Sequence, residues 1–263
     1  MPGASCDACQ GMARSPGLSM NHPALPPFHT ATLLIDLDGT LLDLAPTPDS
    51  VVVPPGLIET VRTLRGQLDG ALAIVTGRPI EVIDALLGDA PHAVAGEHGG
   101  ALRRGPGEGV ERPDLKAPPE AWIARGAALE AAWPGAMLER KARGFGLHFR
   151  LAAPDSGAAI HDSLAALVAD SVDFELMPGK MLWEVRPRGA DKGHAVTSLM
   201  TRAPFLGRVP VFIGDDVTDE DGMRVARAMG GAGLRVPEVF GDPSGVRAWL
   251  RATAARGGWG DFP

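Results

Sequence analysis

Two short apolar runs of this sequence are each followed by a cluster of acidic residues. The first run begins at Ala31 and leads into Asp36 and Asp38, and the second, at 209–213, leads into Asp215 and further acids. Ligands of open α/β sheets bind at the carboxyl ends of the strands. If both runs are parallel strands, their carboxylates meet at one edge, where like charges repel unless a cation neutralises them.

Oxygen ligands of this kind favour Mg²⁺, which proteins usually hold through one or two carboxylates, waters and phosphate oxygens. Asp36 and Asp38 stand two residues apart, so in an extended chain both reach the same face. One carboxylate of such a pair can attack an electrophile, and the other can act as general acid and then general base. An isolated pair with this spacing is common by chance, and its meaning depends on the surrounding motifs.

Composition limits the classes of protein that fit. The chain has 263 residues, of which 45% are hydrophobic and 22% charged, with a net charge of −7. This balance is typical of a soluble globular protein and argues against a nucleic-acid binder, which normally carries a basic face. Neither a membrane-spanning run nor a secretory signal is expected, so the cytoplasm is the predicted location. Cys6 and Cys9 lie in a Gly- and Pro-rich stretch and predict no zinc site.

The order of apolar patterns predicts strands that alternate with helices. Runs typical of buried strands lie at 31–37, 71–75 and 209–213, and helical spacing separates them. The fold class expected is therefore α/β with a mostly parallel sheet. A stretch rich in Gly, Pro and charge at 103–119 interrupts this pattern. An α+β pattern follows it, with Pro178 and Gly179 as the predicted turn of a hairpin.

The predicted organisation is a core interrupted by a cap. We expect a flexible N-terminal tail at 1–29, a core built from 30–104 and 188–263, and an inserted cap domain at 105–187.

Four motifs resemble those of the haloacid-dehalogenase-like hydrolases, which have a Rossmann-like core and, in one class, a C2-type cap. They are DLDGTL at 36–41, VTGR at 75–78, DKG at 191–193 and GDDVTDE at 214–220. The resemblance implies Asp36 as nucleophile, Asp38 as acid and base, and Thr76 and Lys192 on the phosphoryl oxygens. It also implies Mg²⁺ held by the Asp36 carboxylate, the Asp38 carbonyl, Asp215 and, directly or through water, Asp219.

Further segments narrow the resemblance to the trehalose-6-phosphate phosphatases. They are the complete GDDVTDE motif, AGEHG at 95–99 and GKMLWEVRP at 179–187. The resemblance implies a sugar-phosphate substrate whose remote glucose unit contacts Lys180 and Glu184. These two residues stand four apart on a predicted strand and so share a face. The remaining substrate-binding candidates are Arg78, His98 and Asp216.

Other functions remain open on the residues alone. A phosphatase for sucrose phosphate or mannosyl-phosphoglycerate would use the same core, as would a sugar phosphomutase. A catalytically silent sensor is disfavoured, because pure binding needs no pair of carboxylates beside a metal. We expect a small-molecule sugar phosphate as the partner, with no nucleic acid or membrane, and a monomer.

Overall fold

Five strongly apolar strands form the parallel part of the larger sheet of this computed structural model. The structure describes residues 23–45, 50–112, 115–141, 143–179, 181–189 and 191–263. The strand order is β10-β9-β1-β2-β3-β4, with β4 antiparallel at one edge. The bounds of the six strands of this sheet are Ala31–Ile35 (β1), Leu72–Val75 (β2), Ala93–Gly96 (β3), Ala101–Arg103 (β4), Val209–Gly214 (β9) and Ala232–Arg235 (β10). The central strands are buried on both faces, as continuous apolar runs in parallel sheets require.

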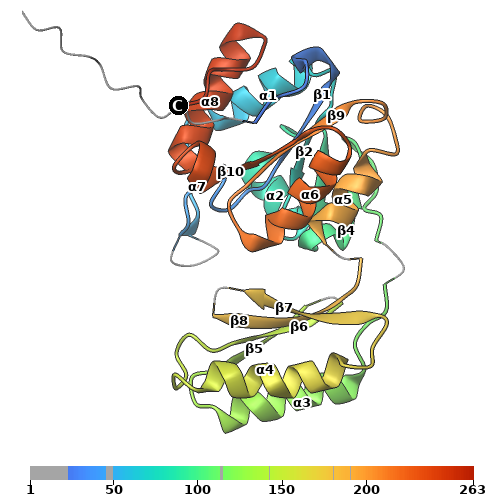
Figure 1. Cartoon of the computed structure of the whole chain (residues 1–263), viewed down its shortest axis with the longest axis vertical. Helices are drawn as coiled ribbons and strands as arrows, with labels where there is room; N and C mark the ends of the chain where they lie inside the picture. Colours follow the sequence, from blue (N-terminus) through green and yellow to red (C-terminus); the bar gives the residue numbers. More distant parts are fainter. Residues whose placement is uncertain (1–22, 46–49, 113–114, 142, 180, 190) are drawn as a thin grey trace, which may run out of the picture.

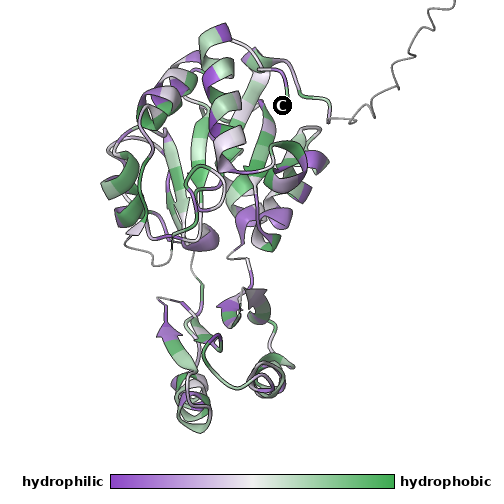
Figure 2. Cartoon of the chain, turned by 90° about the vertical axis from the view of Figure 1, so that its left-hand side faces the viewer, coloured by the Kyte–Doolittle hydropathy of each residue, from purple (hydrophilic) through white to green (hydrophobic). Residues whose placement is uncertain are grey.

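Helices pack on both faces of this sheet (Figure 1). Helix α1 lies against α8, and α5 lies against α6, which in turn contacts β9 and β10. The helices are α1 (Leu57–Gln67), α2 (Ile80–Leu87), α5 (Lys192–Leu199), α6 (Glu220–Ala228), α7 (Val236–Val239) and α8 (Pro243–Arg256). Figure 2 shows the apolar strands enclosed between these layers. The predicted α/β fold with a mostly parallel sheet is confirmed.

A second, antiparallel sheet with the order β5-β6-β8-β7 forms the cap. Helices α3 and α4 cover the face of this sheet that lies away from the core (Figure 1). Buried Phe145, Leu147 and Val185 form part of the apolar cluster between the sheet and the helices. The elements are α3 (Glu120–Ala132), β5 (Met137–Arg140), β6 (Phe145–His148), α4 (Ser156–Val168), β7 (Phe174–Gly179) and β8 (Leu182–Pro187).

The predicted core and cap segments each contribute to one sheet. Strands between 31 and 103 and between 209 and 235 form the first sheet, and strands between 137 and 187 form the second. The predicted boundaries at 104/105 and 187/188 themselves stay predictions. No helix within the described ranges is long and apolar enough to cross a bilayer.

The hairpin turn of the cap does not lie where the sequence pattern predicts it. Pro178 and Gly179 belong to β7, where they pair with Trp183 and Leu182 of β8. β7 is one of the two edge strands of its sheet, so the missing N–H of Pro178 can face away from the ladder. The turn follows Gly179 instead.

Part of the predicted tail also packs against the core. The Phe28 ring meets Trp259 edge-on at 4.9 Å between centroids, and the indole N–H of Trp259 donates to the Pro26 carbonyl at 2.6 Å. The C-terminal segment thus holds residues 26–28 in place. The Cys6 and Cys9 pair lies outside the described residues.

The close approach of β9 and β10 yields a prediction about stability. A Cβ added at Gly231 would lie 1.8 Å from the carbonyl oxygen of Pro210. The backbone of the two strands would have to separate, so Gly231→Ala should destabilise the protein by about 1–3 kcal/mol. Thermal melting checks this. The matched control is Gly66→Ala near the end of α1, where nothing lies within 4 Å, and which should stabilise by about 0.5–1 kcal/mol. A G231A protein that melts at or above the parental temperature would contradict the expectation.

Candidate active site

The carboxyl ends of three adjacent parallel strands bring the predicted residues together. Asp36 directly follows β1, Thr76 directly follows β2 and Asp215 directly follows β9. β1 lies between the other two strands. In β1, Ile35 pairs with Ile74 of β2 and with Ile213 of β9, so the three strands end almost level. The register of the sheet therefore decides which side chains become neighbours.

Two glycines let the acidic segments approach one another. Gly39 has a φ of +78°, and a Cβ there would lie 2.2 Å from Oδ2 of Asp215. A Cβ at Gly214 would lie 2.3 Å from Cγ of Asp219. Gly39 also supplies the left-handed backbone of the turn that leaves β1. The spacing of the carboxylates depends on the absence of both side chains.

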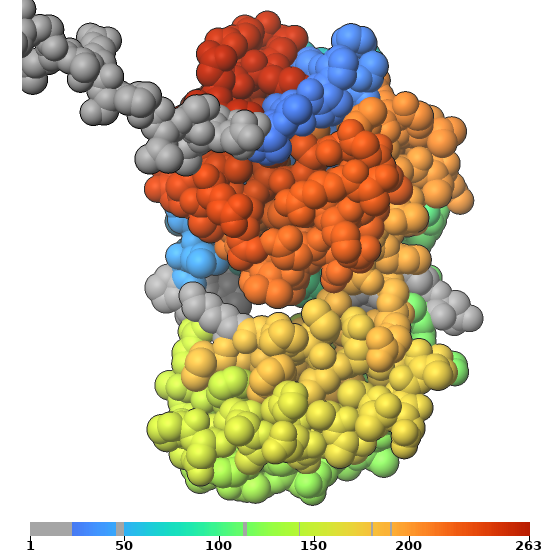
Figure 3. Space-filling view, viewed as in Figure 1, coloured from blue at the N-terminus to red at the C-terminus, as the bar shows by residue number. Residues whose placement is uncertain are grey.

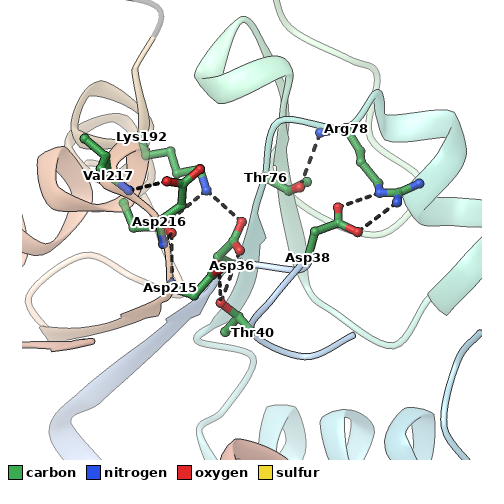
Figure 4. A network of polar contacts seen from close by, with 10 residues as sticks. Asp36, Asp38, Thr40, Thr76, Arg78, Lys192, Asp215, Asp216 and Val217 are labelled. Atoms are coloured by element: carbon green, nitrogen blue, oxygen red, sulfur yellow. Dashed lines mark hydrogen bonds and ion pairs between the residues drawn. The ribbon is translucent and has the colours of Figure 1, made fainter. Parts of the chain in front are cut away.

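Lys192 lies at the centre of the acidic cluster (Figure 4). Its Nζ donates to Oδ1 of Asp36 at 2.7 Å and to Oδ1 of Asp219 at 2.6 Å, and its side chain is 3% exposed. Burial acts to lower the pKa of Lys192, but the two carboxylates outweigh it and raise that pKa above its usual range. The ammonium group is therefore charged at neutral pH. Lys192 is the first residue of α5. Asp191, which precedes it, caps the helix by accepting from the His194 N–H at 2.8 Å.

Asp219 is completely buried and uses both of its oxygens within the protein. Oδ1 accepts from Lys192, and Oδ2 accepts from the backbone N–H groups of Asp215 at 3.1 Å and Asp216 at 2.9 Å. Asp219 thus fixes the backbone that carries Asp215 and orients Lys192.

Asp36, Asp215 and Asp219 offer oxygen atoms that all lie within 4.8 Å of one another. Burial, together with the charge of Asp219, raises the pKa of Asp36 to about 8, although Lys192 acts in the opposite direction. Burial and the charges of Asp219 and Asp216 also raise the pKa of Asp215. Such crowded carboxylates are stabilised in their charged form by a cation. An all-oxygen donor set of this kind suits a hard divalent ion.

Asp38 points away from this cluster, toward Arg78 (Figure 4). The Arg78 guanidinium donates to Oδ2 of Asp38 at 2.6 Å and to Oδ1 at 2.8 Å. The backbone N–H of Arg78 also donates to the hydroxyl of Thr76 at 3.3 Å. Arg78, predicted to bind substrate, therefore contacts the predicted acid and base in this conformation.

A cleft of about 300 Å³ separates this edge of the core from the cap, and the opening between the two parts is visible in Figure 3. Glu184, predicted to bind the remote sugar, lies on its cap side. Lys141 donates to Oε2 of Glu184 at 2.7 Å. Lys180, the predicted partner of Glu184, falls outside the described residues. The residues that line the cleft are Gly77, Pro79, Glu97, His98, Gly100, Glu139, Arg140, Lys141, Arg143, Gly144, Glu184, Arg186 and Pro187.

His98 lies on the core side of the cleft with a left-handed backbone, at a φ of +55°. Its ring lies so close to Gly77 that a Cβ there would come within 2.5 Å of Nε2. Burial, and then the charges of Lys192, Lys141 and Arg186, lower the pKa of His98 well below its usual range. The imidazole is therefore neutral at neutral pH. The backbone N–H of His98 donates to the Thr76 carbonyl at 2.9 Å.

Several cleft residues were missed by sequence reasoning, namely Glu139, Lys141, Arg143 and Arg186. The spacing of Glu139 in β5 and Lys141 just after it was the available signal, but which face of the sheet these side chains occupy depends on the pairing of β5 with β6. Asp216 has a structural role: its Oδ1 accepts from the Val217 N–H at 2.5 Å and caps the short helix at 217–219. Its predicted contact with substrate stays a prediction.

Comparison with known proteins agrees with this geometry. The sequence profile of the trehalose-phosphatase family matches residues 34–245. The chain is 42% identical over 205 residues to a probable trehalose-phosphate phosphatase of Sinorhizobium fredii, covering 78% of this chain and 77% of that protein. It is 38% identical over 208 residues to the trehalose-6-phosphate phosphatase of Escherichia coli, covering 76% and 75%.

A solved structure supports the same fold. The C-terminal domain of the Candida albicans trehalose-6-phosphate phosphatase superposes with a TM-score of 0.71 at 20% identity, covering 87% of this chain and 93% of that one. The profile match spans the strand-end cluster and the whole cap, and two relatives exceed one-third identity over most of their length. The chain therefore belongs to the trehalose-phosphatase family.

Proposed function

We propose that this protein is a Mg²⁺-dependent phosphatase that hydrolyses trehalose 6-phosphate to trehalose and phosphate through an aspartyl-phosphate on Asp36. The observation that carries the proposal is the buried contact of Lys192 with Asp36 and Asp219 beside Asp215, at the carboxyl ends of the central strands. Family membership adds the substrate, because the relatives named above are trehalose-phosphate phosphatases.

The first half of the reaction forms a bond between Asp36 and phosphorus. A carboxylate oxygen of Asp36 attacks the phosphoryl group in line, and the ester bond to the sugar oxygen breaks. An ammonium group has three N–H donors. Asp36 and Asp219 accept two of those from Lys192, so the third can bind a phosphoryl oxygen and stabilise its charge. The Thr76 hydroxyl, one strand away, can donate to another.

Asp38 moves the protons in both halves of the reaction. It gives its proton to the departing sugar oxygen, then takes one from the water that attacks the aspartyl-phosphate, which releases Asp36 and inorganic phosphate. In the present conformation both oxygens of Asp38 accept from Arg78. Arg78 thus orients the carboxyl group that exchanges the proton, and the remaining lone pairs of its oxygens stay available.

The residues that would hold Mg²⁺ are Asp36, Asp215, Asp219 and the main-chain carbonyl of Asp38. Bound there, the ion supplies neutralisation of the acids and polarisation of the phosphoryl oxygens. The raised pKa values of Asp36 and Asp215 support this assignment, because the metal-free cluster holds more negative charge than its surroundings stabilise.

The cap supplies the contacts to the sugar. Glu184 of β8 and Lys141, which directly follows β5, both line the cleft. Charged side chains are strong hydrogen-bond partners for sugar hydroxyl groups. Lys180 and His98 would complete the contacts. All the proposed residues come from one chain, so a monomer suffices for the reaction.

A substrate panel tests the proposed activity. With Mg²⁺ present, phosphate release should be much faster from trehalose 6-phosphate than from sucrose 6-phosphate, mannosyl-phosphoglycerate or glucose 6-phosphate. Asp36→Asn removes the nucleophile and should lower kcat more than about a thousandfold. Asp69→Asn is the matched control and should keep parental activity, because Asp69 precedes β2 and so lies at the opposite end of the strands from Asp36. Equal release from all substrates would refute the substrate, and an active D36N would refute the nucleophile.

Metal binding should depend on pH with a defined sign. Without metal, the pKa of Asp36 is about 8, above the 3.8 of an exposed carboxyl. The folded protein therefore binds this proton more tightly than the unfolded chain, and its metal-free stability falls as pH rises between those values. Mg²⁺ needs the deprotonated carboxylate, so the rise in Tm on adding Mg²⁺ should be larger at about pH 9 than at about pH 6. Asp215→Asn should remove most of the increment. An increment that is independent of pH, or that survives in D215N, would count against this site.

The cap contact should separate binding of the sugar from chemistry on the phosphate. Glu184→Gln leaves the shape but weakens hydrogen bonds to sugar and to Lys141. We expect kcat/KM for trehalose 6-phosphate to fall by about 10- to 100-fold, with little change for p-nitrophenyl phosphate, which has no remote sugar. Asp162→Asn, on α4 at the far side of the cap, is the control. Equal losses on both substrates would mean that Glu184 serves the core chemistry or the fold instead.

A further inference from the structure

Thr40 places one buried hydroxyl between two carboxylates of the core. Its Oγ1 lies 3.2 Å from Oδ2 of Asp36 and 3.3 Å from Oδ1 of Asp215, in hydrogen-bonding geometry with both. Thr40 has no exposed surface, and 175 residues separate it from Asp215. The contact with Asp215 therefore joins the end of β1 to the end of β9 (Figure 4).

The two oxygens of Asp36 have different partners. Oδ1 accepts from the Lys192 ammonium at 2.7 Å, whereas Oδ2 accepts from the Thr40 hydroxyl. A carboxylate held from both sides cannot rotate freely about its Cβ–Cγ bond, so each oxygen keeps its own surroundings. Oδ2 shares the hydroxyl with Asp215, and Oδ1 lies beside the cation that would stabilise a phosphoryl group.

We propose that Thr40 is a positioning residue that divides the two oxygens of Asp36 between two tasks. Its hydroxyl, which donates to either oxygen in turn, keeps Oδ2 of Asp36 and Oδ1 of Asp215 together as the oxygen pair that faces a divalent cation, and it leaves Oδ1 of Asp36 to attack phosphorus. The inference rests on the proposed function and assigns to Thr40 a part in it that touches neither substrate nor metal.

The local backbone fixes Thr40 in this place. Gly39, with its left-handed φ of +78°, brings the next residue under Asp215. A threonine hydroxyl offers one proton and two lone pairs, so it can donate to one carboxylate at a time. Ligating carboxylates are generally held by hydrogen bonds of this kind, and loss of such a partner weakens metal binding by about 10- to 100-fold.

The test compares two variants of nearly the same shape. Thr40→Val keeps the branched side chain and removes the hydroxyl, whereas Thr40→Ser keeps the hydroxyl and removes the methyl group. Mg²⁺ binding to the full chain without substrate is measured by isothermal titration calorimetry. T40V should bind Mg²⁺ about tenfold more weakly, and T40S should stay within about threefold of the parent. At saturating Mg²⁺, T40V should also show a lower kcat with an unchanged KM for trehalose 6-phosphate.

Asp215→Asn separates failure of this inference from failure of the site. D215N should lose most Mg²⁺ affinity. If it does and T40V binds Mg²⁺ as tightly as the parent, the role of Thr40 is refuted while the proposed site stands. If D215N binds Mg²⁺ like the parent, the site is misplaced and the inference falls with it. Should T40V melt well below the parent, Thr40→Ala takes its place in the same titration, and equal weakening in T40S would also refute the role of the hydroxyl.

Discussion

Burying several carboxylates at one edge of a sheet is the constraint on which the rest of this structure depends. Asp36, Asp215 and Asp219 lie within a few ångströms of one another, where unscreened like charges repel strongly. One buried cation, Lys192, contacts two of them, and backbone N–H groups occupy the other oxygen of Asp219. Charge balance here is therefore a condition of folding, and under the proposed function the same ammonium group also serves the chemistry.

The same constraint explains why two aspartates of one short motif have different surroundings. Asp36 is nearly inaccessible and lies among acids and Lys192, whereas the Asp38 side chain is 29% exposed and is held by Arg78. The two carboxyl groups of one motif thus lie in contrasting environments, one enclosed among charged groups and the other partly open to solvent beside a guanidinium. The turn at Gly39 follows both residues, and its left-handed backbone lets the chain leave the end of β1 there.

The local pattern of the sequence was enough to predict the core, whereas contacts between residues far apart in the chain could not be predicted from it. The apolar strands and the motif residues after them could be predicted because each depends on a few consecutive residues. The contact of Lys141 with Glu184 joins residues 43 apart, and that of Thr40 with Asp215 joins residues 175 apart. Such contacts follow from strand register, which the sequence pattern alone does not specify. Pro178 was assigned to a turn for a related reason, since its place on an edge strand was unknown.

Register also determines which residues the cap presents to the cleft. Gly146 of the central strand β6 pairs with Glu139 on one side and Glu184 on the other. Side chains alternate along a strand, so the neighbours of Gly146, Phe145 and Leu147, point into the apolar cluster under α3 and α4. Gly146 therefore lies between two acids on the cleft face, and the side chain of Leu182 occupies the space that a larger residue would need there. A slip of one residue would turn the acids toward the apolar cluster, so the packing of that cluster is what keeps Glu184 in the cleft.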